Sequence, residues 1–492
     1  MLVRLIGACA AALVLAGGCG GGGGGAETEG ADRVPASADL FAAINTDFEG
    51  EQWQTAAELL EKFPGGDLAV QSFLDSAEED DIDFERDIKP AIGPELDIVI
   101  VEFPTGGAEP DVVALTQPRD REKFDALMEK GDEPAVYEIV DDWAVIAETQ
   151  EAIDRFQQAA EEDALGDSDA FDAAMDDLPD DALVKVYVNV RALSEIADTE
   201  AQVQTEELQE CAPGGQASAF GAAVRAEQEG VRFDAAAPTA GGEGFPTYAA
   251  DLPEAVPSGA LAYFSFNNLA DPIRDFLRCA GERNEDVDRG VAQLELALGV
   301  SLEEDILPLL ENEGAITVYR GGQGEQIPAV SLVLEVENET EALETLDRLA
   351  GRADQFIGGV DVSETEVDGV TAKRVTLPDG DFSLLYAVFD GKLVVTTAEA
   401  GIAALRADGE KLADDEVYEQ ALEAADAPDE TTGFAYANLQ ASVDYVLALI
   451  DASGDQPPPP QIRDNLEPLQ SFLLYGSSAD DEVKVAGAVR VE

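Results

Sequence analysis

Histidine is absent from this 492-residue chain. The side chain that most often serves as a general base or metal ligand near neutral pH is therefore missing, and so are Ser-His and Cys-His nucleophile pairs. Outside a run of glycines near the N-terminus, the chain also has no G-x-G-x-x-G, P-loop, G-x-S-x-G or C-x-x-C pattern. These absences exclude most enzyme chemistry, and we expect a protein that is not an enzyme and needs no cofactor.

Basic residues are scarce: 29 Lys and Arg stand against 104 Asp and Glu, for a net charge of −75. Such a surface repels nucleic acid and anionic lipid headgroups, and it attracts cations and basic proteins. Two interpretations remain open. The carboxylates either solvate the fold, as in secreted proteins from salty habitats, or bind cations as their function. In the first case the fold should be weaker at low salt.

Long apolar runs are missing after the N-terminus, where residues 1–4 and 5–15 have the order of a secretory signal. Small residues then precede Cys19, as in a bacterial lipobox, although Leu15 lies four positions before the cysteine instead of three. We predict a signal peptide over 1–19 and lipidation of Cys19. The protein would then be exported and held on the outer face of the cytoplasmic membrane by this lipid anchor alone; the alternative is secretion after cleavage near Gly18.

Residues 20–33 begin with six glycines and continue with small and acidic residues. This composition cannot bury a core, so it predicts a flexible linker between the anchor and the folded body.

Only two cysteines remain in the folded body, Cys211 and Cys279. In an oxidising compartment two thiols indicate a disulfide more simply than a metal site, and we expect no metal. Two buried free thiols are the alternative.

An internal repeat runs through the body. The segment from Val34-Pro35 resembles that from Val256-Pro257, and residues 85–90, 98–100 and Pro110 match 303–308, 316–318 and Pro328 at a common offset of 218. The offset then grows to about 249, which indicates an insertion around 360–388 containing extra hairpin length. Beyond it, 145–149 matches 395–399, 184–190 matches 433–439, and the closing hairpin 219–237 matches 472–491.

Helices alternate with hairpin-linked strands inside each copy. The sequence therefore predicts an α+β fold with two tandem copies of a mostly antiparallel sheet on which helices pack. We place the first repeat domain at 34–237, an inter-domain linker at 238–255 and the second repeat domain at 256–492. The two copies could pack as a pseudo-twofold pair.

Four segments resemble a known family: Val34 to Phe41, Asp305 to Pro308, Leu412 to Tyr418, and Phe171 to Asp181. They are similar to the domain of unknown function 3352 family, found in exported actinobacterial proteins. Gly93 fits the small residue expected after the Asp-Ile-x-Pro segment, whereas the second copy departs with Glu311-Asn312. The resemblance implies a fold and an exported location, and it carries no reaction.

Three acidic segments are candidate cation sites. Residues 78–83 lack the EF-hand glycine and closing glutamate, so a solvated loop ending in an Asp83 helix cap is the simpler interpretation. Residues 167–169 precede a helix and are interpreted as a cap, and 379–381 as a turn. Ser301 with Glu304 forms the pattern of a capping box.

These observations favour a non-catalytic surface lipoprotein that binds or scaffolds an envelope component through the cleft or sheet faces of its paired domains. The sequence does not identify the partner. One alternative is a carboxylate-dependent hydrolase acting on envelope glycan, for which two tryptophans, Trp53 and Trp143, offer few stacking surfaces. The other is a low-affinity cation-binding protein.

Overall fold

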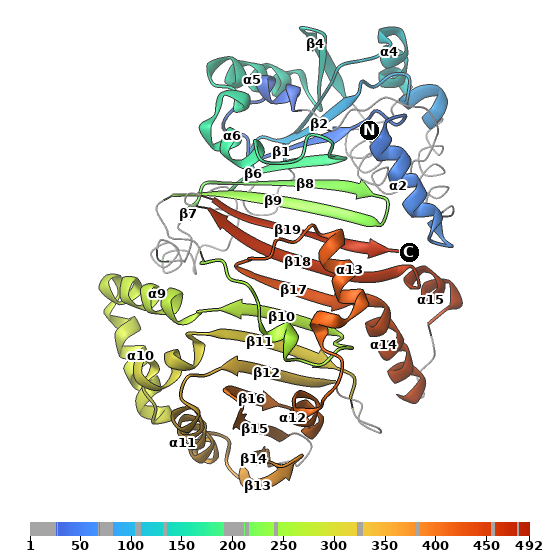
Figure 1. Cartoon of the computed structure of the whole chain (residues 1–492). Coiled ribbons are helices and arrows are strands. Elements are labelled where there is room, and N and C mark those ends of the chain that lie inside the picture. Colours follow the sequence, from blue (N-terminus) through green and yellow to red (C-terminus); the bar gives the residue numbers. More distant parts are fainter. Residues whose placement is uncertain are drawn as a thin grey trace.

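A computed structural model describes residues 26, 28–66, 68, 82–103, 110–130, 135–190, 211, 216–240, 245–321, 328–378, 383–453, 458–479 and 482–492. Within them the protein is an α+β structure built on one large antiparallel sheet (Figure 1), which confirms the predicted class. The predicted signal peptide, Cys19 and the glycine run lie outside the described residues.

The first half of the sheet has the spatial order β4-β5-β3-β2-β1-β6-β8-β9, and the two-residue β7 pairs with the end of β9. These strands are β1 (Leu40–Asn45), β2 (Glu95–Ile100), β3 (Val112–Thr116), β4 (Val136–Val140), β5 (Trp143–Ala147), β6 (Val184–Asn189), β7 (Gln216–Ala217), β8 (Ala219–Glu227) and β9 (Gly230–Ala240).

The second half continues the sheet in the order β19-β18-β17-β10-β11-β12-β16-β15-β14-β13. Its strands are β10 (Ala262–Asn267), β11 (Glu313–Tyr319), β12 (Ala329–Glu335), β13 (Asp361–Val367), β14 (Val370–Thr376), β15 (Ser383–Phe389), β16 (Lys392–Thr396), β17 (Gly433–Asn438), β18 (Leu469–Ala479) and β19 (Glu482–Val491).

The halves meet where β9 pairs with β19 in antiparallel register, Ala235 opposite Val485. Counting outward from this junction, β8, β6, β1, β2, β3 and β5 occupy the same places as β18, β17, β10, β11, β12 and β16. The segments that match in the sequence therefore occupy equivalent strands. Because the paired strands at the junction are themselves equivalent and antiparallel, this pairing is the one that a twofold relation between the halves requires.

The insertion in the second half is the hairpin β13–β14, which has no counterpart among the described strands of the first half. Its turn contains Asp368 and Gly369, both with positive φ (47° and 80°), as expected for a type I′ turn that follows the right-handed twist of the strands.

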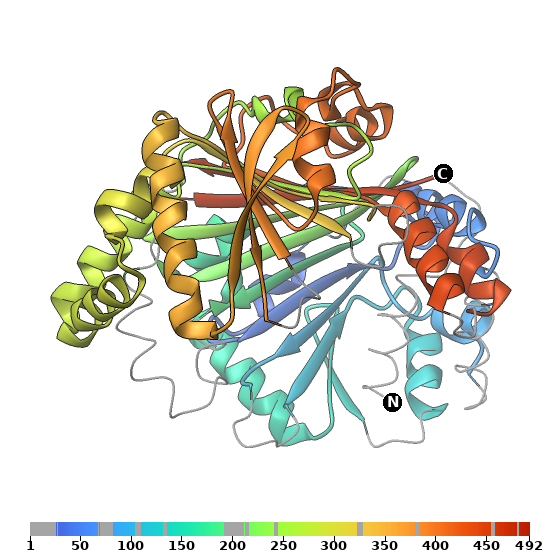
Figure 2. The same ribbon diagram turned by 90° about the horizontal axis from the view of Figure 1, so that it is seen from below.

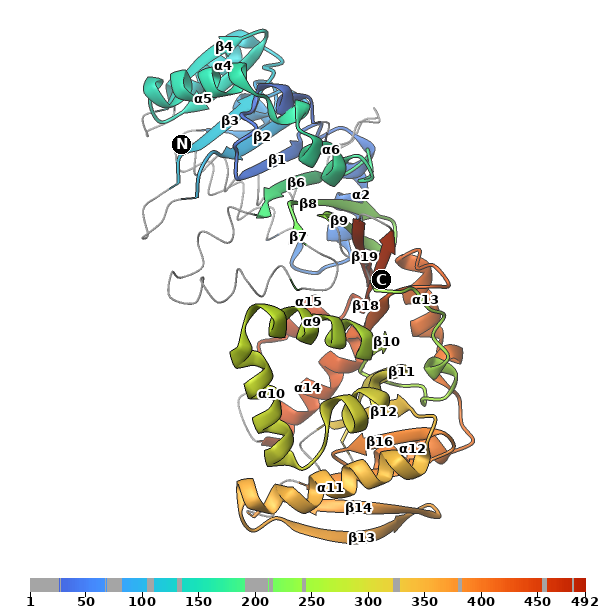
Figure 3. The same cartoon turned by 90° about the vertical axis from the view of Figure 1, so that its left-hand side faces the viewer.

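Helices lie on both faces of this sheet (Figures 1 and 3). They are η1 (Glu29–Arg33), α2 (Glu51–Glu61), η2 (Phe84–Ile88), α4 (Arg121–Lys130), α5 (Gln150–Glu162), η4 (Leu165–Asp167), α6 (Asp169–Met175), η5 (Leu252–Glu254), α9 (Ala270–Arg283), α10 (Glu285–Leu298), η6 (Leu302–Ile306), η7 (Leu307–Leu310), α11 (Glu339–Ile357), α12 (Glu399–Arg406), η8 (Leu412–Asp414), α13 (Glu416–Ala424), α14 (Leu439–Ser453) and α15 (Pro460–Leu466). In the described part of the chain, none of these is both long and apolar enough to span a bilayer.

The sheet bends, so that it has an outer and an inner side (Figure 3). Helices α6, α13 and α12 cover the outer side, whereas α2, α9, α10, α14 and α15 lie on the inner side, with α9 and α10 at one end of the strands and α14 and α15 at the other (Figure 2). The outer side holds a buried core in each half, centred on Phe41 and Trp143 in the first and on Tyr263 and Tyr436 in the second.

Equivalent capping starts η2 and η6. The Asp83 carboxylate accepts the Arg86 N–H (2.7 Å), and Ser301 Oγ accepts the Glu304 N–H (3.2 Å). The predicted caps at Asp83 and Ser301 are therefore confirmed. In a capping box the Ser301 N–H would donate to the side chain of Glu304, three positions later. Here it donates to the carboxylate of Asp305 instead, because η6 is a single π-helical turn, in which the residue that faces the cap comes one position later.

Both segments assigned to linkers are structured in part. Residues 29–33, predicted to be flexible, form η1, whose Ala31 is buried in the first outer core. Part of the segment 238–255 is also structured: Tyr248 forms a β-bridge with Thr431, and Leu252 of η5 is buried in the second outer core. Composition misses both because short alanine- and proline-containing turns become ordered only through tertiary packing.

Cys211 and Cys279 are bonded, with 5.6 Å between their Cα atoms. The bond ties the chain ahead of β7 in the first half to α9 in the second.

Candidate functional site

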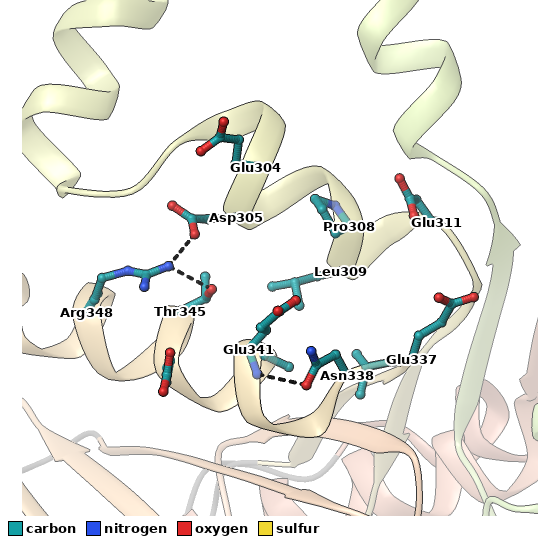
Figure 4. A pocket seen from close by; sticks show the side chains of 13 residues that line it. Glu304, Asp305, Pro308, Leu309, Glu311, Glu337, Asn338, Glu341, Thr345 and Arg348 are labelled. Atoms are coloured by element: carbon teal, nitrogen blue, oxygen red, sulfur yellow. Dashed lines mark hydrogen bonds and ion pairs between the residues drawn. The ribbon is translucent and has the colours of Figure 1, made fainter.

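An acidic pocket of about 370 Å³ lies between η6–η7 and the N-terminal half of α11 (Figure 4). Pro308, Leu309 and Ala342 form part of its apolar wall. Asn338 caps α11 at the pocket by accepting the Thr340 and Glu341 N–H groups (3.2 and 3.3 Å). Six carboxylates line it: Glu304, Asp305, Glu311, Glu337, Glu341 and Glu344.

Two of these carboxylates are already neutralised. The Arg348 guanidinium pairs with Asp305 inside the pocket, and Arg274 pairs with Glu311 (2.5 Å) beside it. Among the described residues, the other four carboxylates of the pocket form no ion pair. The pocket is thus a negative surface that already accommodates one guanidinium, and it suits a further ammonium or guanidinium group.

A metal ion is a poorer match for the pocket. No three acidic or metal-binding side chains of the described chain converge closely enough to hold one. Calcium requires six to eight oxygen ligands at 2.3–2.6 Å, which scattered single carboxylates do not supply.

The second candidate is an apolar surface on the inner side of the sheet. Because directly paired residues point to the same side, the pairing places a continuous series of apolar side chains there, from β6 across the β9–β19 junction to β12. We call this set the inner sheet face. It consists of Val184, Val186, Val188, Phe220, Ala222, Val224, Phe233, Ala235, Ala237, Val483, Val485, Val489, Phe472, Leu474, Ala435, Ala437, Ala262, Phe264, Ile316, Val318, Val330 and Leu332.

Every member of the inner sheet face is half-buried or exposed. Phe264 is 46% exposed, and its cross-strand partner Ile316 is 39% exposed; Phe220 in the first half is also 39% exposed. Their sequence neighbours on the outer side, such as Tyr263 and Ala315, are almost fully buried. At its margins, Val184 and Val489 pack against the buried cluster that contains Trp53 of α2, and Leu332 packs against the one that contains Ala342 of α11. A soluble protein rarely leaves the apolar surface between such clusters open unless it binds something.

The helices on the inner side add to this apolar surface. Leu294 and Leu296 of α10 are 53% and 80% exposed, and Val446 of α14 and Ile462 of α15 are about half exposed. Neither α10 nor α14 has a fully buried residue.

Buried carboxylates occupy the opposite, outer side. Glu95 starts β2 and accepts the Gly30 N–H of η1 (3.2 Å). Glu313 starts β11 and accepts the N–H groups of Asp251 (2.7 Å) and Leu252 (3.1 Å) at η5. Burial raises the pKa of the Glu313 carboxyl to about 7, although these N–H donors oppose the shift.

Asp97 is fully buried beside Glu95, and neither of its oxygens has a hydrogen-bond partner at ordinary distance. Burial, together with the neighbouring Glu95 carboxyl, raises the pKa of Asp97 well above its ordinary value. Gly30 is required here, because a Cβ at this position would come within 1.7 Å of Asp97 Oδ2. These carboxylates are buried, so they are elements of the fold rather than of a surface site.

Comparison with family models gives one match over residues 127–485, to "Protein of unknown function (DUF3352)". The chain belongs to this family. No curated protein matches it.

Among solved structures, three crystal forms of TP0453 are similar to parts of this DUF3352 protein. Form IV is 11% identical with a TM-score of 0.24, covering 50% of this chain and 94% of that one. Forms III and I are 10% identical with TM-scores of 0.23, covering 48% and 50% of this chain and 92% and 94% of theirs. Likeness at this level supports no conclusion about fold or function.

Two of the acidic segments of the DUF3352 chain flank helices. Asp83 is a helix cap, as predicted, whereas the cap predicted at 167–169 is wrong: α6 begins at Asp169, but Ser168 makes no side-chain cap bond. Both tryptophans, Trp53 and Trp143, are buried, so neither can stack on a sugar. Residues 78–81 and 379–381 lie outside the described part of the chain.

The sequence led us to expect binding at a cleft or sheet face, but it assigned no residue to either candidate site. The pocket joins η6–η7 to α11 across a hairpin, so no short motif contains it. The inner sheet face did leave a signal: strands such as Phe434-Ala-Tyr-Ala437 are apolar at consecutive positions and so supply apolar side chains to both sides of the sheet. The sequence does not show which of the two sides is covered.

Proposed function

We propose that this DUF3352 protein is an exported, non-catalytic binding protein, anchored through lipid at Cys19 to the outer face of the cytoplasmic membrane. It holds an envelope component on its inner sheet face. The observation that carries this proposal is the apolar, half-exposed surface that continues across both halves of the sheet.

Two further features support the proposal. The Cys211–Cys279 disulfide is typical of proteins outside the cytosol. A net charge of −75 keeps such a protein soluble despite its open apolar surface, because like-charged molecules repel one another.

The alternatives have less support. A glycan hydrolase needs two carboxyl groups flanking a sugar site, and the residues that line the acidic pocket include no aromatic side chain on which a sugar ring could stack. A cation-binding role would rest on the same pocket, whose carboxylates are dispersed and partly paired with arginine.

Site-specific photo-crosslinking in the native envelope tests the proposal. Benzoyl-phenylalanine is placed at Phe264 or Phe220 on the inner sheet face and, as a control, at Val362 on β13, which is similarly exposed at 43%. We expect adducts from the first two positions in illuminated cells and none from the third. Equal adducts at all three positions, or none at any, would contradict a binding role for this face.

A further inference from the structure

We infer that the occupant of the inner sheet face is a long acyl chain of an individual lipid. This inference rests on the proposed function and names the ligand class for the same surface. Three properties of the surface point to hydrocarbon: its side-chain chemistry, the use of its backbone groups, and the charge around it.

The side chains of the inner sheet face supply no hydrogen-bond donor or acceptor and no charge, since all are alanine, valine, leucine, isoleucine or phenylalanine. The backbone groups of its central strands are committed to pairing on both edges, from β6 to β12. Protein–protein interfaces carry about one hydrogen bond per 100–200 Å². A surface whose side chains are apolar from β6 to β12, apart from Ser478 opposite Val483 at the end of β18, is better matched to a ligand that has no polar groups along its length.

A second copy of the chain does not suit this surface. Two molecules, each with a net charge of −75, would repel one another as they approached. A long acyl chain avoids this cost because it is uncharged along its length. The same repulsion disfavours anionic headgroups, so the lipid that binds should have a neutral or zwitterionic head.

The shape of the sheet agrees with an elongated occupant. The inner sheet face lies on the inside of the bend, bordered by α9 and α10 at one end of the strands and by α14 and α15 at the other (Figures 2 and 3). Exposed apolar side chains on those helices, such as Leu294 and Val446, extend the apolar lining beyond the sheet.

Displacement of an uncharged fluorescent lipid, the methyl ester of cis-parinaric acid, from the full chain carrying Cys19→Ser tests the inference, because this variant has no lipid attached. The competitors are monoacylglycerols with chains of 8, 12 and 16 carbons, which share one neutral head. Burying a methylene contributes about 0.8 kcal/mol, so each added pair of carbons should strengthen binding by up to about tenfold. We expect saturable binding and at least a hundredfold preference for 16 carbons over 8.

Variants locate the binding surface. Phe264→Asn combined with Ile316→Asn places two amides at a directly paired position of the inner sheet face, and Val362→Asn makes the same kind of change on β13. We expect at least a tenfold loss of affinity in the first variant and none in the second. If the double variant does not fold, as judged by circular dichroism, Phe220→Asn in the other half replaces it.

The outcomes separate the two proposals. Absence of probe binding, no dependence on chain length, or equal affinity in the inner-face and β13 variants would overturn the acyl-chain assignment. If crosslinking from Phe264 still gives adducts and these are proteins, the binding role stands and only the ligand class is wrong. If crosslinking also fails, both fall.

Discussion

Glu95 and Glu313 occupy the same place in the two halves of the protein. Each begins the strand that pairs with the first strand of its half, opposite Asn45 and Asn267 respectively, and each is buried. Each accepts backbone N–H groups from the short 3₁₀ turn ahead of that first strand. Both halves of the repeat thus contain a buried glutamate whose carboxylate holds the preceding 3₁₀ turn against the sheet.

Glu313→Gln should change how stability depends on pH. With a folded pKa of about 7 and an ordinary value of 4.5, the folded state retains a proton between these values that the unfolded state has lost. The free energy of unfolding should therefore fall by about 3 kcal/mol as pH rises through this window. Urea unfolding at pH 4, 5.5 and 7.5 should show this fall reduced in Glu313→Gln and unchanged in Glu419→Gln, an exposed control; an equal fall in all three proteins would contradict the assignment.

Asp97→Asn should stabilise the protein at pH 7 by about 1–3 kcal/mol, because it removes a buried carboxyl that lies beside the Glu95 carboxyl and replaces it with a neutral group of the same shape. Because the folded pKa of Asp97 is raised, the parent protein loses stability as the pH rises above the ordinary pKa of an aspartate. The stability gained by Asp97→Asn should therefore shrink toward zero near pH 3. Thermal midpoints at both pH values measure this. A loss of stability at pH 7 would show that Asp97 is stabilising as a carboxylate.

Cys279→Ser should lower the free energy of unfolding by roughly 2–4 kcal/mol, because the disulfide restricts a 68-residue segment of the unfolded chain. Denaturation with and without a reducing agent provides the measurement. The reducing agent should destabilise the parent chain and leave Cys279→Ser and the Cys211→Ser/Cys279→Ser double variant unaffected. A larger effect in the double variant than in the single one would indicate a separate role for Cys211.

Salt should stabilise the protein without regard to the cation. With a net charge of −75, screening reduces repulsion between carboxylates in the folded state. Thermal midpoints should rise equally in NaCl, KCl and CaCl₂ at matched ionic strength. A rise caused by sub-millimolar Ca²⁺ alone would instead favour the cation-binding alternative, and the acidic pocket would be the first place to substitute residues, beginning with Glu341→Gln.

Local patterns in the sequence were enough to predict the α+β class, the matching strands of the two copies, the inserted hairpin and the caps at Asp83 and Ser301. Each of these depends on residues close together in the chain: alternation of apolar side chains along a strand, positive φ at Asp368-Gly369, or a side chain reaching an N–H three residues later. The choice between a disulfide and free thiols at Cys211 and Cys279 had to wait for the structure, because spacing alone does not measure distance.

The tertiary structure alone decided that the two halves share one sheet through β9 and β19, and that apolar residues such as Phe264 stay open on its inner side while Asp97 is buried on the other. Pairing of strands 250 or so residues apart and the covering of one sheet face depend on long-range packing, which local sterics and periodicity do not encode. The sequence by itself determined the helices and strands of this protein. The packing of those helices against the sheet determined that the inner sheet face is the surface left free to bind.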